Sequence, residues 1–496
     1  MGLRSLFVNL NTSSAQYWSK HYDLQKANDN GRKIILIDDG MVVLVNGFCE
    51  YNTMDCFGLM KFDFEGNLIW KAVALDTLDV NHGEAIEVIN DTIFVNANYL
   101  DVPNKHYCVI AFNMQGNYLS RRDYEYPGLL NYHWAREIAA LGDRRFVTFQ
   151  YRDTATGRYM GRLRAFDNNW NIVWERSISN FYPHVGWCEM EPTPDGGAAM
   201  IYSSCQTYHC RASIEKYDAS GGLEWTTVFP KDYNSATWVD LAVHPDGGYV
   251  GFWRIDTFGI FIYPYPELVF KLDAAGQFEW QKVRFDRAQN FWQVFAAQNG
   301  DIIACGVAQD FYQDTIDYFA GLIRRLKPNG ETRWERKIFD YTDGGIRNQF
   351  FYGVEMPNGD LVFSGDIRDT LPDDPYPGNV WLVKLDSNGC FTPGCGEEQY
   401  LVAAKEPQQA VEEQPFALFP NPFSDHITLA AVLGRHIPPG EYRAVLYDAQ
   451  GQIIRQQSFS PNLLTYFDTE DAPPGAYILA VYKDGVLMQT LKAVKP

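Results

Sequence analysis

The sequence has no apolar stretch long enough to cross a membrane as a helix. Such a helix takes roughly 18 or more consecutive apolar residues, and no run in these 496 residues approaches that length. An excess of basic charge is also missing, because 62 Asp and Glu residues outnumber 42 Lys and Arg residues and give a formal net charge of -20. Nucleic acids and anionic membranes attract basic surfaces, so this balance argues against both as partners.

The short motifs that mark common catalytic and cofactor sites are absent as well. The chain contains no G-x-S-x-G, H-E-x-x-H or G-x-G-x-x-G motif, no phosphate-binding loop and no EF-hand loop. Its nine histidines are scattered. We therefore predict no metal and no cofactor, and we assign no catalytic residue. A quinoprotein dehydrogenase is an alternative that no residue demands.

Cysteine is scarce, and none of the nine cysteines forms the C-x-x-C pair of a zinc or redox site. Three pairs lie close in sequence, and this spacing favours disulfides in an exported protein. The pairs are Cys49 with Cys56, Cys205 with Cys210, and Cys390 with Cys395. Cys108, Cys188 and Cys305 lie in strand-like segments and are expected to be buried thiols. A metal site at Cys205, His209 and Cys210 is the weaker interpretation of that segment.

One small unit is repeated through the first four-fifths of the chain. Leu268 to Trp280 reads as a strand, a turn closed by Gly276, and a second strand that carries Trp280. The turn position recurs seven times, 50 to 59 residues apart, at Gly66, Gly116, Trp170, Gly221, Gly276, Gly330 and Gly389. Tryptophan follows five of these turns, at Trp70, Trp174, Trp225, Trp280 and Trp334, whereas Leu119-Ser120 takes its place after Gly116. We expect these tryptophans to be core residues.

Each unit also has an earlier hairpin turn, such as Asp246-Gly247-Gly248, which gives four short strands in about 50 residues. The seventh unit lacks its Trp strand, but Tyr17 to Tyr22 at the other end of the chain has the right pattern. We predict an all-β fold with a seven-bladed β-propeller over residues 16–395, closed by this N-terminal strand. A solenoid or two sandwiches would not explain the complementary ends. The units resemble the Trp-containing repeats of quinoprotein-like bacterial propellers.

A polar linker over residues 396–414 precedes a predicted small Ig-like β-sandwich over residues 415–496. Four motifs follow one another there: Pro420-Asn421-Pro422, a turn from Asp448 to Gly451, Gly475 with Tyr477, and a tail with Lys492. This series resembles the type A C-terminal sorting domain of the Bacteroidetes type IX secretion system. The resemblance implies passage through Sec, recognition by the type IX machinery, and delivery to the outer-membrane surface or the extracellular space. An ordinary Ig-like adhesion module is the alternative. Residues 1–15 have the order of a signal peptide, and we expect a remnant of one there.

Aligning the predicted blades on their first turns gives a candidate site. Five or six residues before the turn stand Glu84, Glu137, Glu189, Asp240, Gln293 and Tyr352. Two residues earlier stand His82, Ala135, Trp187, Trp238, Phe291 and Phe350. We expect these positions near one mouth of the central channel, and take Glu84, Glu137, Glu189, Asp240, Trp187 and Trp238 as a ligand-binding hypothesis. The carboxylates and rings suit a sugar, a cation or a basic peptide. Alternatively, the acids bond backbone amides and the rings pack between blades.

A second candidate surface consists of two aromatic segments, Phe258–Pro266 and Phe311–Phe319, which we expect to be loops. From these features we predict an exported propeller that binds a glycan, peptide or surface partner. The alternative is an extracellular hydrolase or lyase with catalytic carboxylates such as Glu137 and Glu189 at the mouth.

Overall fold

The structure is a computed structural model of the whole chain. It describes residues 17–24, 29–48, 55–73, 80–101, 104–124, 133–153, 156–178, 184–206, 209–229, 235–256, 267–284, 289–312, 316–340, 347–368, 378–395, 400–402, 416–419, 423, 426–431, 438–461 and 465–496. Within these ranges the chain forms strands and turns, and it contains no helix that could span a membrane. The chain divides into two compact units, residues 1–404 and 405–496, which are described separately.

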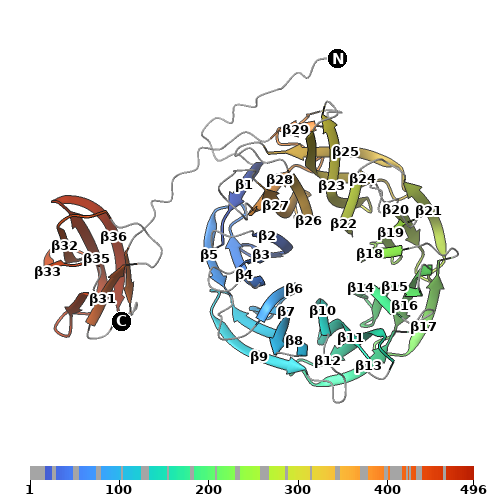
Figure 1. Cartoon of the computed structure of the whole chain (residues 1–496), viewed down its shortest axis with the longest axis horizontal. Helices are drawn as coiled ribbons and strands as arrows, with labels where there is room; N and C mark the ends of the chain where they lie inside the picture. Colours follow the sequence, from blue (N-terminus) through green and yellow to red (C-terminus); the bar gives the residue numbers. More distant parts are fainter. Residues whose placement is uncertain are drawn as a thin grey trace. The chain divides into compact units, whose positions relative to one another are not determined.

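The first unit is a ring of seven four-stranded antiparallel sheets, the blades of a β-propeller (Figure 1). Blade 1 has β2 (Asn30–Ile37), β3 (Gly40–Phe48), β4 (Asp55–Phe62) and β5 (Leu68–Val73), and blade 2 has β6 (Val80–Ile89), β7 (Thr92–Asp101), β8 (Asn104–Asn113) and β9 (Tyr118–Tyr124). Blade 3 has β10 (His133–Leu141), β11 (Arg144–Arg152), β12 (Tyr159–Phe166) and β13 (Ile172–Ser177), and blade 4 has β14 (His184–Pro192), β15 (Ala198–Gln206), β16 (His209–Tyr217) and β17 (Leu223–Val228). Blade 5 has β18 (Ser235–Val243), β19 (Tyr249–Asp256), β20 (Glu267–Leu272) and β21 (Phe278–Arg284), and blade 6 has β22 (Gln289–Ala296), β23 (Ile302–Tyr312), β24 (Ile316–Leu326) and β25 (Thr332–Phe339). Blade 7 has β26 (Arg347–Glu355), β27 (Leu361–Arg368), β28 (Gly378–Leu385) and β1 (Trp18–Tyr22), and the short β29 (Tyr400–Val402) pairs with β25.

The predicted ring closure by the N-terminal strand is confirmed. Strand β1 pairs antiparallel with β28, with Trp18 opposite Lys384. Trp18 is buried, and Trp381 Nε1 donates a hydrogen bond to Ser19 Oγ at 2.8 Å. The first and last parts of the propeller sequence therefore share one blade, and two sheet edges that could recruit another chain are removed.

The blades are locked together by a repeated contact between tryptophan and glycine. The outer-strand tryptophan of one blade lies on the turn glycine of the next, so a Cβ added at Gly66 would lie 2.5 Å from the Trp18 ring. The other pairs of this kind are Trp70 with Gly116, Trp174 with Gly221, Trp225 with Gly276, Trp280 with Gly330, and Trp334 with Gly389. Only glycine combines the positive φ of these turns with room for the ring. The repeated tryptophans are therefore packing residues.

The junction between blades 2 and 3 reverses this arrangement. Ser120 takes the tryptophan position in blade 2, and Trp170 takes the glycine position in blade 3 with a φ of 62°. Trp170 is buried and its ring centroid lies 5.0 Å from that of Phe94 in blade 2. The junction thus keeps a tryptophan, which comes from blade 3 instead of blade 2.

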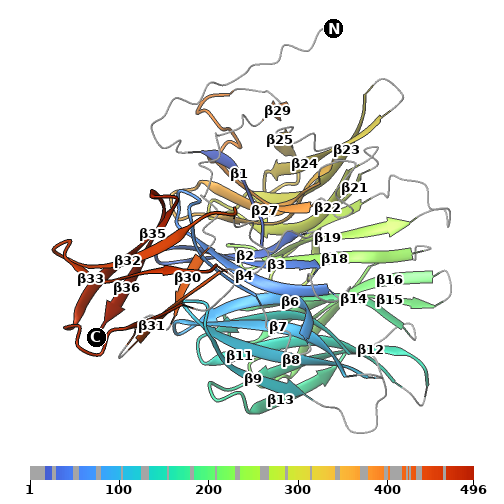
Figure 2. The ribbon, with the colours of Figure 1, turned by 60° about the vertical axis from the view of Figure 1, so that its left-hand side comes forward.

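The second unit is a small β-sandwich, as predicted (Figure 2). One sheet contains β30 (Phe416–Phe419), β31 (His426–Ala431) and β34 (Thr465–Asp468), and the other contains β33 (Ile453–Phe459), β32 (Tyr442–Asp448), β35 (Gly475–Lys483) and β36 (Val486–Lys495). Their facing side chains form one apolar core.

The predicted sorting motifs lie at defined positions in this sandwich. Asp448 Oδ1 accepts the N–H groups of Gln450 and Gln452 at 2.9 and 2.8 Å, and Gly451 closes the turn with a φ of 80°. Gly475 begins β35, Tyr477 is buried in the core, and Lys492 lies on β36. Pro420, Asn421 and Pro422 lie outside the described residues.

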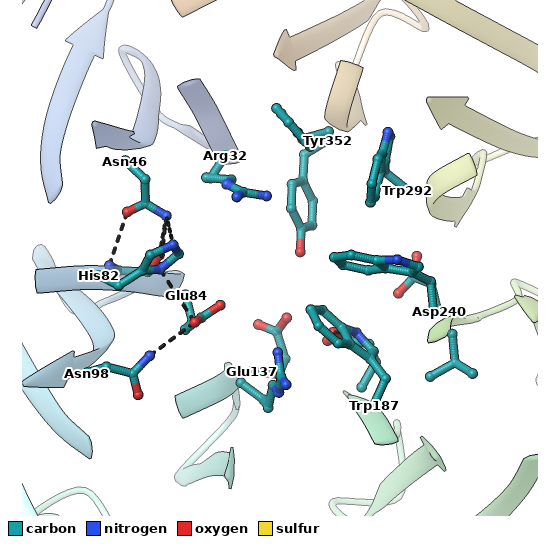
Figure 3. A pocket seen from close by; sticks show the side chains of 16 residues that line it. Arg32, Asn46, His82, Glu84, Asn98, Glu137, Trp187, Asp240, Trp292 and Tyr352 are labelled. Carbon is teal, nitrogen blue, oxygen red and sulfur yellow. Dashed lines mark hydrogen bonds and ion pairs between the residues drawn. The ribbon is translucent and has the colours of Figure 1, made fainter. Parts of the chain in front are cut away.

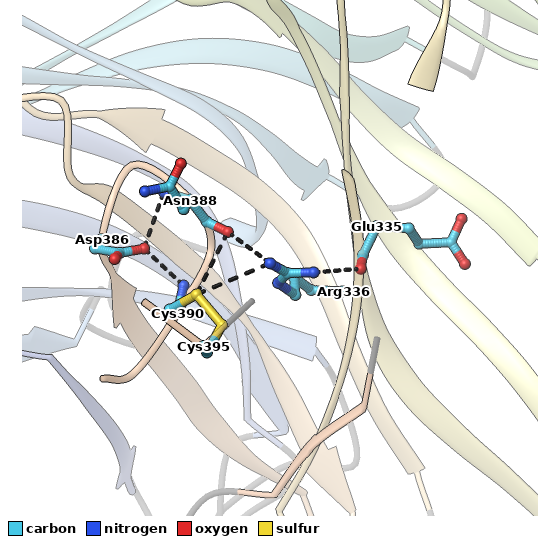
Figure 4. Close-up of a disulfide and its surroundings, with 6 residues drawn as sticks. All are labelled: Glu335, Arg336, Asp386, Asn388, Cys390 and Cys395. Carbon is cyan, nitrogen blue, oxygen red and sulfur yellow. Dashed lines mark hydrogen bonds between the residues drawn. A yellow bond between two sulfur atoms is a disulfide. The ribbon is translucent and has the colours of Figure 1, made fainter. Parts of the chain in front are cut away.

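Two of the predicted disulfides are present, Cys205–Cys210 and Cys390–Cys395. The first joins β15 to β16 and uses both sulfurs of the segment for which a metal site was the alternative. The second follows the last turn of blade 7, where Asp386 Oδ1 accepts the N–H of Cys390 at 2.8 Å (Figure 4). Cys49, and with it the predicted Cys49–Cys56 pair, lies outside the described residues. Cys108, Cys188 and Cys305 are buried free thiols, as expected.

Candidate binding site at the axial mouth

The innermost strand of every blade contains a β-bulge near its start. At each bulge the inner strand has one residue more than its partner strand. The bulged residues are Arg32-Lys33, Asn81 and Glu84, Arg136-Glu137, Gly186-Trp187, Thr237-Trp238, Trp292 and Phe351. A bulge re-aims a side chain that regular pleating would direct into the space between blades. The repeated bulges therefore give each blade a side chain for the axis.

Side chains from all seven blades surround one cavity of about 340 Å³ (Figure 3). Blades 1 to 3 contribute mainly polar and charged groups, namely Arg32, Asn46, His82, Glu84, Asn98, Arg136 and Glu137. Blades 4 to 7 contribute the aromatic residues Trp187, Trp238, Trp292, Phe351 and Tyr352, together with Glu189 and Asp240. The cavity is thus polar on one side and aromatic on the other.

On the polar side, side chains of second strands hold the bulged backbone of the next blade. Asn46 of β3 donates to the Gly83 carbonyl at 2.8 Å and accepts the Gly83 N–H at 3.1 Å. Asn98 of β7 accepts the Ala135 N–H at 2.7 Å and donates to Glu84 Oε1 at 3.0 Å. Since these bonds replace ladder bonds that a bulge interrupts, they fix the positions of the polar groups that face the cavity.

On the aromatic side, four rings form a continuous wall. Successive ring centroids are 4.0 Å apart for Trp187 and Trp238, 4.6 Å for Trp238 and Trp292, and 5.6 Å for Trp292 and Phe351. Trp187 Nε1 donates to Glu189 Oε1 at 2.7 Å, which orients both groups. Rings that hold one another in this way offer a preformed surface for stacking.

The carboxyl groups of the mouth differ in charge. Glu137 is buried and forms an ion pair with Lys33. Burial alone would lower the pKa of Lys33, but the carboxylates of Glu137, Glu87 and Glu191 raise it above its ordinary value. Burial, followed by the charges of Glu137 and Asp240, raises the pKa of Glu189 well above its ordinary value. The pair Glu137 and Glu189 therefore combines a carboxyl group that is paired with a lysine and one that retains its proton to higher pH.

Asp240 and two further acids extend this cluster. Burial raises the pKa of Asp240 to about 7, although its carboxylate also accepts the Val294 N–H at 2.6 Å. Glu87 and Glu191 lie further along β6 and β14, and burial raises the pKa of Glu191 to about 8. No group of His, Cys, Asp and Glu in the described part of the chain is arranged to hold a metal ion.

Comparison with known families identifies the second unit. Residues 417–495 match the secretion system C-terminal sorting domain. The chain is a cargo of the type IX secretion system. It is exported to the cell surface or the extracellular space, and it interacts with the secretion machinery through this domain. A comparison with curated proteins gives no match.

Solved structures similar to the cargo chain share little sequence with it. The polysaccharide lyase Uly1 has 10% identity and a TM-score of 0.37, with 62% of this chain and 90% of that chain covered. A Penicillium chrysogenum alpha-L-arabinanase has 12% identity and a TM-score of 0.41, with 62% and 94% covered. The β-propeller domain of the Trilobed protease from Pyrococcus furiosus has 8% identity and a TM-score of 0.42, with 72% and 95% covered. Likenesses at this level carry nothing about ligand or activity.

All six residues of the ligand-binding hypothesis line the cavity of this cargo propeller: Glu84, Glu137, Glu189, Asp240, Trp187 and Trp238. Their positions are not equivalent between blades, however. Glu84 and Glu137 are bulge residues, whereas Glu189 and Asp240 each lie two residues after the bulged tryptophan. Counting back from a turn aligned them incorrectly because the bulge adds a residue that the sequence pattern does not mark.

The same misalignment affected blades 6 and 7. Phe291 and Phe350 are fully buried, and the neighbouring Trp292 and Phe351 line the cavity instead. Gln293 accepts the Gly353 N–H at 2.6 Å, which is the structural role foreseen as the alternative for the acids. Tyr352 lines the cavity as expected.

Sequence reasoning missed the contribution of blade 1. Arg32 and Lys33 are bulge residues there, and Lys33 pairs with a carboxylate 104 positions away. The only signal was the distance of Lys33 from the Asp39-Gly40 turn, which matches that of Glu84 from Asn90. The prediction of a second surface made of two aromatic loops is wrong for one segment and untested for the other. The 311–319 segment is not a loop, because its described residues continue the β23–β24 hairpin. Residues 258–266 lie outside the described residues.

Proposed function

We propose that the exported propeller binds a carbohydrate at its axial mouth. The observation that carries this proposal is the division of a single cavity into an aromatic wall, from Trp187 to Phe351, and a polar wall of amide, imidazole and carboxyl groups. A sugar ring has an apolar face that stacks on aromatic rings and an edge of hydroxyl groups that donate and accept hydrogen bonds. The two walls match these two surfaces.

The other ligands suggested by the sequence fit less well. A cation or a basic peptide would meet the guanidinium groups of Arg32 and Arg136, which lie over the rings of Phe351 and Trp187 at 4.4 and 3.8 Å. The carboxylate of Glu137 is already neutralised by Lys33. Repulsion and competition therefore favour a saccharide over a cationic ligand.

A glycan-array screen of the full chain tests the proposal. We expect binding to a defined sugar class, and we expect Trp187→Ala and Trp238→Ala each to weaken it at least tenfold, because each removes a stacking ring. Tyr118→Ala on the outer strand β9 is the matched control, since it removes an exposed aromatic ring far from the axis. Binding that survives both tryptophan substitutions would contradict a site at the mouth.

A second candidate function is a hydrolase or lyase at the same mouth. It is favoured by the contrast between Glu137, which is paired with Lys33, and Glu189, whose pKa is raised, since glycoside cleavage uses one carboxylate and one carboxylic acid. Glu189→Gln separates the two functions because the amide oxygen still accepts the Trp187 N–H. Product release by the wild type that the variant loses while it still binds would support the enzyme. Binding without any product from the wild type would support the binding module.

A further inference from the structure

We propose that the saccharide bound at the mouth carries an oxyanion, a carboxylate or a sulfate ester, and that Arg32 and Arg136 bind this group. The inference rests on the proposed carbohydrate site and specifies its ligand. Both arginines come from bulges in inner strands, β2 and β10, and both line the cavity.

Arg32 has no anionic partner in the part of the chain that the structure describes. Its Nε is buried and has no hydrogen-bond partner, and no ion pair to it is found among the described residues. Its guanidinium lies over the Phe351 ring at 4.4 Å, and the side chain points into the cavity (Figure 3). The ring holds the group in place but does not neutralise its charge.

Arg136 forms no ion pair among the described residues, although its charge acts on the nearby Glu189 carboxyl group and lowers the pKa of that group. It donates from Nε to Oε1 of Gln150 at 2.8 Å, and its guanidinium stacks on Trp187 at 3.8 Å. Gln150 is itself fixed, because its Nε2 donates to the Val185 carbonyl at 3.2 Å. An amide and an aromatic ring orient the guanidinium, and neither carries a negative charge. In the described residues no carboxylate lies within ion-pair distance of it.

Three other buried arginines of the propeller are paired with acids, whereas Arg145 has no ion pair among the described residues and stacks on Trp170 at 4.9 Å. Arg324 pairs with Glu335, Arg164 with Glu175, and Arg325 with Asp301 at 2.7 Å. A cation that is partly withdrawn from water is costly unless an anion compensates it. Two oriented guanidinium groups in one cavity, with no ion pair to either among the described residues, therefore favour an anion from the ligand, and a guanidinium fork matches a carboxylate or sulfate edge.

The acids of the mouth carry too little negative charge to exclude such an anionic ligand. Lys33 neutralises Glu137, and Glu84 lies 3.4 Å from His82 Nδ1 and accepts a hydrogen bond from Asn98. Burial raises the pKa of Glu189 and of Asp240, so these carboxyl groups carry less negative charge than exposed acids near neutral pH. A protonated carboxyl group also donates a hydrogen bond to an oxyanion.

The test measures equilibrium binding of the full chain to matched polymers. Polygalacturonate and alginate are compared with methyl-esterified polygalacturonate, and dextran sulfate with dextran. We expect the charged member of one pair to bind at least tenfold more tightly, and which pair responds distinguishes carboxylate from sulfate. Arg32→Gln and Arg136→Gln should each remove most of this preference, because each weakens binding of the charged member far more than binding of the neutral member. Arg122→Gln, an exposed arginine on β9, removes the same charge away from the mouth and should change neither.

Equal binding of charged and neutral members, or a preference that survives both arginine substitutions, would overturn the inference. An equal loss from Arg122→Gln would do the same, because the effect would then be one of net charge. Arg32→Lys keeps the charge but loses the fork, so we expect an intermediate preference, which guards against a misfolded Gln variant. Neutral saccharides that bind through Trp187 without any charge preference would leave the proposed function intact. If no saccharide bound, both the proposed function and this inference would be contradicted.

Discussion

At the scale of single residues, the contact between blades depends on the absence of a side chain. At Gly276 a Cβ would lie 2.6 Å from the ring of Trp225, and the residue has a φ of 76°. Gly247, in the first hairpin turn of the same blade, has a similar φ of 87°, but the nearest atom to its Cβ would be 3.9 Å away. A substitution at Gly247 tests backbone strain alone, whereas a substitution at Gly276 tests backbone strain together with the clash against the Trp225 ring.

We therefore expect Gly247→Ala to lower the free energy of unfolding by about 1 kcal/mol, from the left-handed backbone alone. Gly276→Ala should cost about 1–3 kcal/mol more, because the tryptophan ring must move. Urea unfolding of the two variants measures the difference. Equal losses would show that the ring yields freely and that the contact does not lock the blades.

The carboxyl group of Asp240 predicts a dependence of stability on pH. Its folded pKa of about 7 exceeds its ordinary value of 3.8, so between these values the folded state binds more protons than the unfolded state. The contribution of Asp240 to stability is therefore most favourable below pH 4 and falls as the pH rises to about 7. Its cause is the burial of a charge that water would otherwise solvate.

Asp240→Asn removes this titration and keeps an oxygen that accepts the Val294 N–H. Relative to the wild type, we expect the variant to gain about 1–3 kcal/mol between pH 4.5 and pH 8.5. Urea unfolding at both pH values gives the difference, which includes the change in the titration of Glu189 and Glu191 once the charge of Asp240 is removed. Parallel pH profiles of the two proteins would contradict the assignment.

At the scale of elements, the inner and outer strands of a blade have separate roles. The outer strands carry the tryptophans that join blades, and the inner strands carry the bulges that direct side chains to the axis. Strand β1 is the outer strand of blade 7, although it begins the described chain. Its side chains therefore connect residues more than 300 positions apart, as in the hydrogen bond from Ser19 to Asp340 at 2.7 Å.

Trp18→Ala tests this connection. Trp18 is 1% exposed and lies on Gly66 of blade 1, so its loss leaves a cavity at the junction that closes the ring. We expect a loss of about 3–5 kcal/mol in the free energy of unfolding. Tyr118→Ala, which removes an exposed ring from β9, should change it by less than about 0.5 kcal/mol. A small effect of Trp18→Ala would mean that β1 contributes little to closure.

At the scale of the whole molecule, the candidate binding site and the sorting domain belong to different units. The propeller holds the mouth, and the sandwich that matches the sorting domain begins after the division at residue 404. Each unit has its own apolar core. Loss of the sandwich should therefore stop export without unfolding the propeller.

Deletion of residues 417–495 is expected to retain the protein inside the cell envelope, with the amount outside the cell reduced to background. Immunoblots of the culture medium, the cell surface and the periplasm measure this distribution. Trp187→Ala in the full chain is the control, since it alters the mouth and should be exported normally. Normal appearance of the truncated chain outside the cell would contradict the role of the sandwich.

The sequence alone determined the architecture because its signals are local and repeated. Asp and Gly at tight turns, tryptophan on the following strand, and complementary ends gave seven blades and their closure, and four separated motifs gave the sorting domain. The exchange of Gly for Trp170 beside Ser120 was visible as a break in the pattern, but its meaning needed the packing of neighbouring blades.

Only the tertiary structure decided which side chains face the axis. A bulge reverses the alternation of a strand without a sequence signal, so Trp292 and Phe351 replace Phe291 and Phe350 at the cavity. The charge of the mouth is likewise non-local, because Lys33 of blade 1 pairs with Glu137 of blade 3, while Arg32 has no ion pair among the described residues. Turn chemistry acts over a few residues, and the site depends on side chains that only closure of the ring brings together.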